Sequence, residues 1–177
     1  FTASQPHAAV VLQYHHIDTT TPSVTSTSPK DFEDHLNYIA STKLRVVTLA
    51  SIVETPNVEV EIEANNRADD RIAITFDDAY LNILENAVPL LRERNWPFTV
   101  FVSTQVVGQK GYLSWDQLRE IEAAGGSIAN HTHTHTHMLR RHDSESLDLW
   151  RARMKDEIMR AQTLLEKHLK SPARHFA

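Results

Sequence analysis

Apolar runs alternate along the chain with longer segments whose apolar residues recur every three or four positions. The short runs are rich in β-branched residues, as expected for buried strands, and cover residues 9–17, 44–49, 71–76, 98–103 and 127–130. Strands that alternate with helical segments in this way predict an α/β domain built on a parallel sheet. The acidic, irregular segment 53–70 interrupts the alternation, and we expect an exposed excursion there.

Capping signals mark where the predicted helices begin and end. Ser28 is expected to cap a helix that starts at Pro29, with Asp31 in its first turn. Ser114 and the residue three positions later, a glutamine, form a capping box, and Gly125 is a suitable stop for that helix. The residues expected to be buried share one face of their helix: Phe32, Leu36 and Ile39; then Leu84, Ala87, Val88 and Leu91; and, in a last helix from about Ser144 to about Leu169, Leu147, Trp150, Met154, Ile158, Ala161 and Leu165.

Several predicted strands end in polar side chains. These are His15 and His16, Asp77 and Asp78, Ser103, and His131. The carboxyl ends of parallel strands meet at one edge of a sheet, and parallel α/β barrels build their sites at that edge. We therefore expect these side chains to gather in one candidate site.

Composition narrows the chemistry available to such a site. The chain has 177 residues, of which 41% are apolar and 23% charged, as in an ordinary domain with a core of its own. It has no cysteine, which excludes disulfides, thiolate ligands and a cysteine nucleophile, so a bound metal would need histidine and carboxylate ligands. No apolar run approaches the roughly 20 residues of a membrane helix. The net charge of -5, with no basic stripe, argues against a nucleic-acid partner.

The first residues, FTASQPHAAV, have neither the basic start nor the long apolar run of a secretory signal peptide. The chain also begins without a methionine. We expect a mature or trimmed form whose leader is absent. The lack of cysteine is compatible with a secreted or periplasmic protein.

Histidines occupy four alternate positions, 131, 133, 135 and 137. On a strand all four would face one side, whereas on a helix residues four apart share a face. If the chain turns helically after His131, then His131 and His135 converge and His133 points elsewhere. With one carboxylate they would form a His₂Asp site for a divalent ion, with an open position for water. A solvated strand face or a loose chelating tract would explain the same pattern, and the tract alone does not decide.

Asp77 and Asp78 follow an apolar strand directly. Adjacent carboxylates repel each other, and a helix N-terminus just beyond them would relieve part of that cost. A simple pair of helix-capping residues is one interpretation. The other is a division of labour, because on a strand the two side chains point in different directions. One can bind a metal while the other stays free as a base, which suits metal-assisted hydrolysis.

Two motifs carry a family resemblance: ITFDDAY at 74–80 and HTHTH at 131–135. They resemble the first motif, T-F-D-D-G-Y, and the second motif, H-[S/T]-x-x-H, of the polysaccharide deacetylase family, the NodB-homology domain of carbohydrate esterase family 4. Other stretches are similar to members with an N-terminal extension: VLQYHHI, SPKDFEDHLNYIASTKLRVVTL and YLSWDQLREIEAAGGSIANHTHTH. The final SPARHFA resembles the approach to the third motif. The resemblance therefore spans nearly the whole chain.

The resemblance implies a role for each matching residue. Asp78, His131 and His135 would be the ligands of one divalent ion, with zinc the first expectation and cobalt or another divalent ion as alternatives. Asp77 would be the catalytic base. The histidines at 133 and 137 would be bystanders, and Thr132 would fix the loop or lie near the bound ligand. The implied fold is a distorted (β/α) barrel of the NodB-homology type.

This sequence departs from the family pattern in two places. Ala79 replaces the usual glycine, a mild change unless the turn needs a positive φ. The chain also ends at Ala177, before the rest of the third motif and before later motifs that supply an Asp and a general-acid His. We expect one domain over 1–177 that lacks its C-terminal strands, with an N-terminal extension and first strands in 1–70 and a metal-site core in 71–177. Turnover by this chain alone is expected to be weak or absent.

The implied reaction is metal-dependent removal of N-acetyl groups from an amino-sugar polymer, with release of acetate. His15, Tyr80, Trp115 and Thr132 are the candidate substrate-binding residues, although core or helix-cap packing would equally explain Trp115. The alternatives are a non-catalytic, metal-containing carbohydrate-binding module, a histidine-rich chelator, and a related amidase acting on a non-sugar amide. The N-terminal extension favours an exopolysaccharide of the poly-N-acetylglucosamine type over chitin or peptidoglycan. Such a substrate implies a secreted, periplasmic or cell-envelope location.

Overall fold

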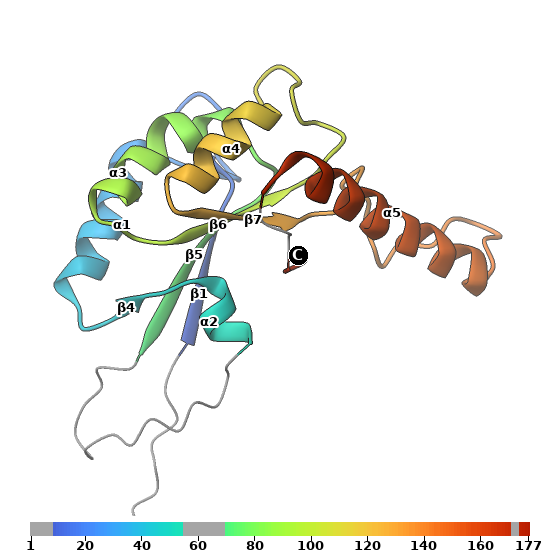
Figure 1. Cartoon of the computed structure of the whole chain (residues 1–177), viewed down its shortest axis with the longest axis horizontal. Coiled ribbons are helices and arrows are strands. Elements are labelled where there is room, and N and C mark those ends of the chain that lie inside the picture. Colours follow the sequence, from blue (N-terminus) through green and yellow to red (C-terminus); the bar gives the residue numbers. More distant parts are fainter. Residues whose placement is uncertain (1–8, 55–69, 171–173) are drawn as a thin grey trace, which may run out of the picture.

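The computed structural model describes residues 9–54, 70–170 and 174–177. In this part of the chain a parallel sheet has the strand order β1-β5-β6-β7, with β4 paired to the start of β5 (Figure 1). These strands are β1 (Ala9–Tyr14), β4 (Arg45–Val46), β5 (Arg71–Phe76), β6 (Phe98–Val102) and β7 (Gly126–Asn130). The predicted α/β domain with a parallel sheet is therefore confirmed.

The strand register aligns the ends of the strands at one edge of the sheet. Tyr14 at the end of β1 pairs with Phe76 at the end of β5, and Phe76 also pairs with Val100 of β6. β6 and β7 end together, because Val102 pairs with Asn130. The polar residues that follow these strands therefore lie at the same edge of the sheet, the edge formed by the carboxyl ends of the strands, as expected from the sequence.

Helices cover the two faces of the sheet unequally. The helical elements are α1 (Pro29–Ser41), α2 (Leu49–Val53), a π-helix η1 (Ile83–Ala87), α3 (Val88–Glu93), α4 (Trp115–Ala123) and α5 (Leu147–His168). Figure 1 shows α1, α3 and α4 side by side along one side of the sheet. They enclose the larger core, around Phe32, Phe76 and Leu118, whereas α2 covers a small cluster that includes Ala73 and Phe101. None of the described helices has the length and apolar character needed to cross a membrane.

The predicted capping signals are confirmed. The Ser28 side chain accepts a hydrogen bond from the Asp31 N–H, and Pro29 is the first residue of α1. Ser114 and Gln117 form the reciprocal bonds of a capping box at the start of α4. Gly125 follows α4 with a φ of +91°, a conformation that residues with a Cβ adopt only at a cost.

Two predicted strands are shorter than expected. The first ends at Tyr14, and after a break at His15 the chain forms β2 (His16–Ile17), which pairs with β3 (Ser26–Thr27) in a separate small sheet. The second is reduced to β4, because the Thr48 side chain caps α2 instead of continuing the strand. Of the expected acidic excursion, residues 55–69 lie outside the described residues.

The last helix begins later than predicted, and its apolar stripe is only partly buried. Ser146 caps α5, and Met154, Ala161 and Leu165 are buried, whereas Leu147 is 44% exposed. In Figure 1 the N-terminal half of α5 projects beyond β7, away from the sheet. The apolar periodicity therefore predicted the helix correctly but not the extent to which the sheet covers it.

The loop before α5 folds back onto the projecting half of the helix. The Trp150 indole N–H donates to the Met138 carbonyl at 3.1 Å. Arg153 donates through two nitrogens to the Glu145 carboxylate, at 2.8 and 2.7 Å, and also to the Arg140 carbonyl at 3.2 Å. These bonds make the loop and the outer half of α5 one packed unit.

A first prediction concerns Gly126, where β7 passes close to the core. A Cβ there would lie 2.6 Å from Cγ2 of Ile121 and 2.7 Å from the ring of Phe98, both buried. We expect Gly126→Ala to lower the free energy of unfolding by about 1–3 kcal/mol, because the surrounding side chains must shift. Chemical denaturation would measure it. Phe98→Leu should lower the free energy of unfolding less in the Gly126→Ala background than in the wild type. An equal decrease in both backgrounds would contradict the steric explanation.

A second prediction concerns the acid sensitivity of the loop. The Arg153 guanidinium lowers the pKa of Glu145 from 4.5 to about 2. A carboxyl whose pKa is depressed on folding stabilises the protein above its unfolded-state pKa, and this contribution disappears as the pH falls toward the folded-state pKa. The difference in free energy of unfolding between wild type and Glu145→Gln should therefore shrink between about pH 5 and about pH 3. A pH-independent difference would show that the ion pair does not contribute.

Candidate metal centre and active site

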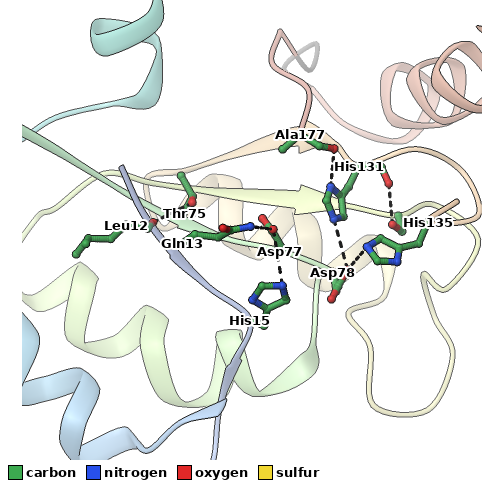
Figure 2. Close-up of polar contacts among 10 residues, drawn as sticks. Leu12, Gln13, His15, Thr75, Asp77, Asp78, His131, His135 and Ala177 are labelled. Carbon is green, nitrogen blue, oxygen red and sulfur yellow. Dashed lines mark hydrogen bonds and ion pairs between the residues drawn. The ribbon is translucent and has the colours of Figure 1, made fainter. Parts of the chain in front are cut away.

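Asp77 is a buried carboxylate at the first position after β5. Its backbone N–H donates to the Tyr14 carbonyl at 2.8 Å, which extends the ladder between β1 and β5 by one bond. The residue is 3% exposed, and its Oδ2 accepts a hydrogen bond from the Gln13 amide (Figure 2). Oδ1 is also buried and has no hydrogen-bond partner within the described chain. One oxygen is therefore held in place, while the other is available to a ligand or a proton.

Asp78 points away from Asp77 because the backbone changes direction between them. Asp78 has a φ of 69° and Ala79 a φ of 59°, both in the left-handed region that residues with a Cβ rarely adopt. The substitution of the family glycine by Ala79 therefore falls at a position that does have a positive φ. The turn is secured by the Leu113 N–H, which donates to the Ala79 carbonyl at 2.9 Å, and by a bridge between Tyr80 and Tyr112.

Asp78 lies against two of the four histidines of the tract. Its Oδ1 is 3.5 Å from Nε2 of His131 and 3.3 Å from Nε2 of His135, as Figure 2 shows. One donor atom from each of the three residues lies within 4.8 Å of the others, so that the group could hold one metal ion. The His131 and Asp78 side chains are 12% and 14% exposed, whereas that of His135 is 60% exposed. Two nitrogens and one oxygen form a donor set suited to a zinc-like divalent ion, with the exposed side left open.

The His131 ring is oriented by a hydrogen bond on its other nitrogen. Nδ1 lies 2.7 Å from the carbonyl oxygen of Ala177. A carbonyl only accepts, so Nδ1 carries the proton, and the Nε2 lone pair faces Asp78. This arrangement is typical of metal-binding histidines, whose second nitrogen is usually bonded to an acceptor. Ala177 is itself held beside β7, because its N–H donates to the Asn130 carbonyl at 3.2 Å.

The histidine tract is a turn, neither a strand nor a helix. Thr132 and His135 have positive φ values of 65° and 57°, which reverse the chain between the two histidines that approach Asp78. His133 points the other way. It is buried, its Nδ1 lies 2.8 Å from the Thr104 hydroxyl, and burial together with the Arg160 charge lowers its pKa. His137 is exposed. The tract therefore brings together the pair expected from the second motif and separates the other two histidines from it.

His15 and Tyr80 each lie beside one of the two carboxylates, His15 beside Asp77 and Tyr80 beside Asp78. Nε2 of His15 is 3.9 Å from Oδ2 of Asp77, and its side chain is 32% exposed. Tyr80 stacks on His16 with ring centroids 3.6 Å apart. Its pKa is raised, first by burial and then by the charge of Asp78, so its hydroxyl remains protonated at neutral pH.

The other two candidate substrate-binding residues have structural surroundings. Trp115 stacks on His168 at the end of α5, at 4.3 Å between ring centroids, and packs against the core. This position favours the packing interpretation over sugar stacking. Thr132 lies between the two histidines but is buried, with its N–H donating to the Asn130 side chain at 2.9 Å. Its hydroxyl has no partner within the described residues.

Sequence reasoning missed Gln13, which holds the Asp77 carboxylate. A signal was present, because Gln13 precedes His15 by two positions and residues two apart on a strand face the same side. An exposed glutamine on a mostly apolar strand is, however, not by itself a reason to choose that residue as part of a functional site. Only the pairing of β1 with β5 identifies Asp77 as its partner.

Comparisons with known proteins agree with this geometry. The sequence model of the family described as polysaccharide deacetylase matches residues 64–177. The Bacillus subtilis protein YxkH is 26% identical over 130 residues, covering 72% of this chain and 43% of that protein. A poly-beta-1,6-N-acetyl-D-glucosamine N-deacetylase of Staphylococcus aureus is 23% identical over 159 residues, covering 86% of this chain and 52% of that protein. The chain thus spans about half the length of these curated relatives.

Solved structures share the fold. IcaB from Ammonifex degensii superposes with a TM-score of 0.79 at 24% identity, covering 97% of this chain and 74% of that one. A de-N-acetylase from Aggregatibacter actinomycetemcomitans also gives 0.79, at 16% identity, covering 94% of this chain and 77% of that one. At these identities the structures show a common fold, whereas the family model matches more than half of the chain. The chain belongs to the polysaccharide deacetylase family.

Proposed function

We propose that this chain is the metal-binding part of a hydrolase that removes N-acetyl groups from an N-acetylglucosamine polymer and releases acetate. The observation that carries the proposal is the pairing of two carboxylates with different surroundings. Asp78 faces His131 and His135, whereas Asp77 is buried beside them, and its Oδ1 has no hydrogen-bond partner among the described residues. A three-residue metal site next to a free carboxylate is the arrangement that metal-assisted hydrolysis requires.

Asp78, His131 and His135 would hold one divalent ion, with zinc as the first expectation and cobalt as the alternative. When bound, the ion would supply Lewis-acid polarisation of the acetamide carbonyl and of a water molecule. The fit is supported by the mixed nitrogen and oxygen donors within 4.8 Å of one another and by the hydrogen bond that aims Nε2 of His131.

Asp77 is the proposed base, and His15 the proposed proton donor. Asp77 Oδ1 would take a proton from the attacking water, whose oxygen bonds to the acetyl carbon. The carbon–nitrogen bond then breaks, and the nitrogen receives a proton from the His15 imidazolium, leaving acetate and a free amine. Nε2 of His15 lies 3.9 Å from Asp77 Oδ2, which places the proposed proton donor beside the proposed base. Gln13 keeps the carboxylate in place throughout.

The name of the Staphylococcus aureus relative supports an N-acetylglucosamine polymer as substrate, and we propose one of the exopolysaccharide type. Tyr80 is positioned to contact a sugar from the rim, since it stacks on His16 and stays neutral beside Asp78. A polymer made outside the cell implies that the protein works in the secreted, periplasmic or cell-envelope space.

A third prediction tests the metal ligands. Elemental analysis should find about one zinc per chain in the wild type, and far less in Asp78→Asn, because a three-ligand site has few donors to spare. His137→Ala is the matched control, since His137 is an exposed histidine of the same tract, and its metal content should equal that of the wild type. Several weakly held ions, unaffected by Asp78→Asn and reduced by His137→Ala, would mean that the tract is a chelating ribbon.

A fourth prediction separates the two carboxylates. In a longer form that includes the later family motifs, Asp77→Asn should reduce acetate release from β-1,6-linked N-acetylglucosamine oligomers by about 10²–10⁴-fold, because general-base catalysis is lost. Its metal content should match that of the wild type, since Asp77 points away from the cluster. Loss of the metal in this variant would contradict the division of roles. Oligomer binding by that longer form without acetate release would instead support a non-catalytic module.

A further inference from the structure

Glu157, on the inner side of α5, reaches the turn between the two histidines that face Asp78. This turn, residues 131–135, is called the His loop below. Glu157 Oε2 accepts hydrogen bonds from the backbone N–H groups of His133, at 3.1 Å, and Thr134, at 2.8 Å. Its Oε1 accepts a third bond from the Thr134 hydroxyl at 3.1 Å. Both carboxylate oxygens are therefore bonded to two consecutive residues of the loop.

The His loop needs such bonds because its backbone is strained and leaves the sheet. Thr132 and His135 have positive φ values, a conformation that is unfavourable for a residue with a Cβ. The His131 N–H still bonds to the Val102 carbonyl of β6, but the N–H groups of His133 and Thr134 bond to no strand within the described residues. An acceptor from another element must satisfy these two groups, and Glu157 supplies it.

The carbonyl side of the His loop is held from the opposite direction. The residues after β6 donate to it: the Ser103 hydroxyl to the His131 carbonyl at 2.8 Å, and the Gln105 N–H to the His133 carbonyl at 2.9 Å. The loop is thus fixed between the β6 connection, which supplies donors, and α5, which supplies a charged acceptor. Charge-assisted bonds of the latter kind are stronger than neutral ones.

The same helix also secures the end of β7. The buried Asn130 side chain donates to the Ile158 carbonyl at 3.0 Å, one residue beyond Glu157, while its oxygen accepts the Thr132 N–H. The α5 backbone therefore holds the point where the His loop begins, and Glu157 holds its middle. His135 follows directly after Thr134, and its side chain is 60% exposed, so its position depends mainly on this backbone.

We propose that Glu157 is a positioning residue that keeps His131 and His135 converged on one point and so sets the affinity of the metal site. The inference rests on the proposed metal binding by Asp78, His131 and His135. Glu157 does not belong to that ligand group and acts through the loop backbone.

A fifth prediction follows, with cobalt(II) as the probe because its visible absorption reports ligand geometry as well as occupancy. Glu157→Ala should weaken cobalt affinity about 10–100-fold, the usual effect of removing a group that orients metal ligands. Glu157→Gln should restore most of the affinity. Its amide oxygen can still accept both N–H groups, and its NH₂ can donate to the Thr134 hydroxyl. Alanine is the best helix former, so the substitution should leave α5 itself intact in the metal-free protein.

Asp156→Ala is the matched control. It removes a negative charge from the neighbouring position of α5, and its carboxylate makes no hydrogen bond to the His loop in the described structure. Its cobalt affinity should equal that of the wild type. Amide hydrogen exchange provides a readout that does not depend on metal, because the N–H groups of His133 and Thr134 should exchange faster in metal-free Glu157→Ala than in the wild type.

Three results would overturn the proposal. Unchanged cobalt affinity and spectrum in Glu157→Ala would show that the loop holds its shape without the carboxylate. Equal losses in Glu157→Gln and Glu157→Ala, or a comparable loss in Asp156→Ala, would show that charge matters and the bonds do not. If Glu157→Ala fails to fold, Glu157→Asp takes its place, because its shorter side chain withdraws the carboxylate from both backbone N–H groups; an affinity equal to that of the wild type would then refute the role.

The experiment also distinguishes this inference from the proposed function. A wild type that binds no cobalt, or keeps it in Asp78→Asn, would refute the metal site itself and with it any effect of Glu157 on affinity. The exchange rates of the His133 and Thr134 amides would still reveal whether Glu157 holds the loop. A normal wild-type site with an unchanged Glu157→Ala variant would refute the positioning role alone.

Discussion

The alignment of β1 with β5, and of β6 with β7, is the constraint on which the candidate site depends. Tyr14 and Phe76 are paired residues at the ends of their strands, and the Asp77 N–H adds one more bond to the Tyr14 carbonyl. A register shift of one residue would turn Asp77 to the opposite face of the sheet. The fully buried Phe76 prevents such a shift, because it would have to leave the core. Hydrophobic burial therefore fixes the strand register, and the register fixes where the two carboxylates lie and which way they point.

Backbone strain is concentrated where the candidate ligands are found. Asp78, Ala79, Thr132 and His135 all have positive φ, and all four belong to or adjoin the metal group. Such conformations persist only when the surroundings determine them, and here each turn is bonded to a neighbouring segment. The Leu113 N–H secures the first turn, whereas Glu157 and the β6 connection secure the second. The turns with positive φ redirect the backbone, so that the carboxylate and the two imidazoles converge on one point, which regular strands would not allow.

The two halves of the α5 helix have different roles. Its C-terminal half contributes Ala161 and Leu165 to the buried interior, as a helix of an α/β domain normally does. Its N-terminal half extends past the sheet and binds the preceding loop through Trp150 and Arg153. Glu157 lies near the boundary, where the helix is anchored by packing yet still reaches the His loop. A carboxylate on a rigid, anchored helix restricts the conformation of the His loop more tightly than a carboxylate on another loop would.

Local rules of helix and strand formation were enough to predict most of the architecture. Ser28, Ser114 and Gly125 act as their residue types indicate, and the buried strands 71–76 and 98–102 follow from apolar runs of β-branched and aromatic residues. The motif around Asp77 and the spacing of His131 and His135 likewise selected the residues that converge. These features are encoded by neighbours in the sequence, so the sequence alone determines them.

Tertiary structure decided what depends on segments that are distant in the chain. From the sequence, the histidine tract could have been a strand face or a chelating ribbon. In the structure His133 is buried against Thr104, whereas His131 and His135 lie beside Asp78. Whether Trp115 packs against another element could not be predicted locally, because its stacking partner His168 belongs to a distant helix. Gln13 and Glu157 act through long-range bonds, to Asp77 and to the His loop, and local sequence patterns do not identify these partners. The sequence thus determined which residues are available for the site, and the pairing of strands and the docking of α5 determined which of them meet.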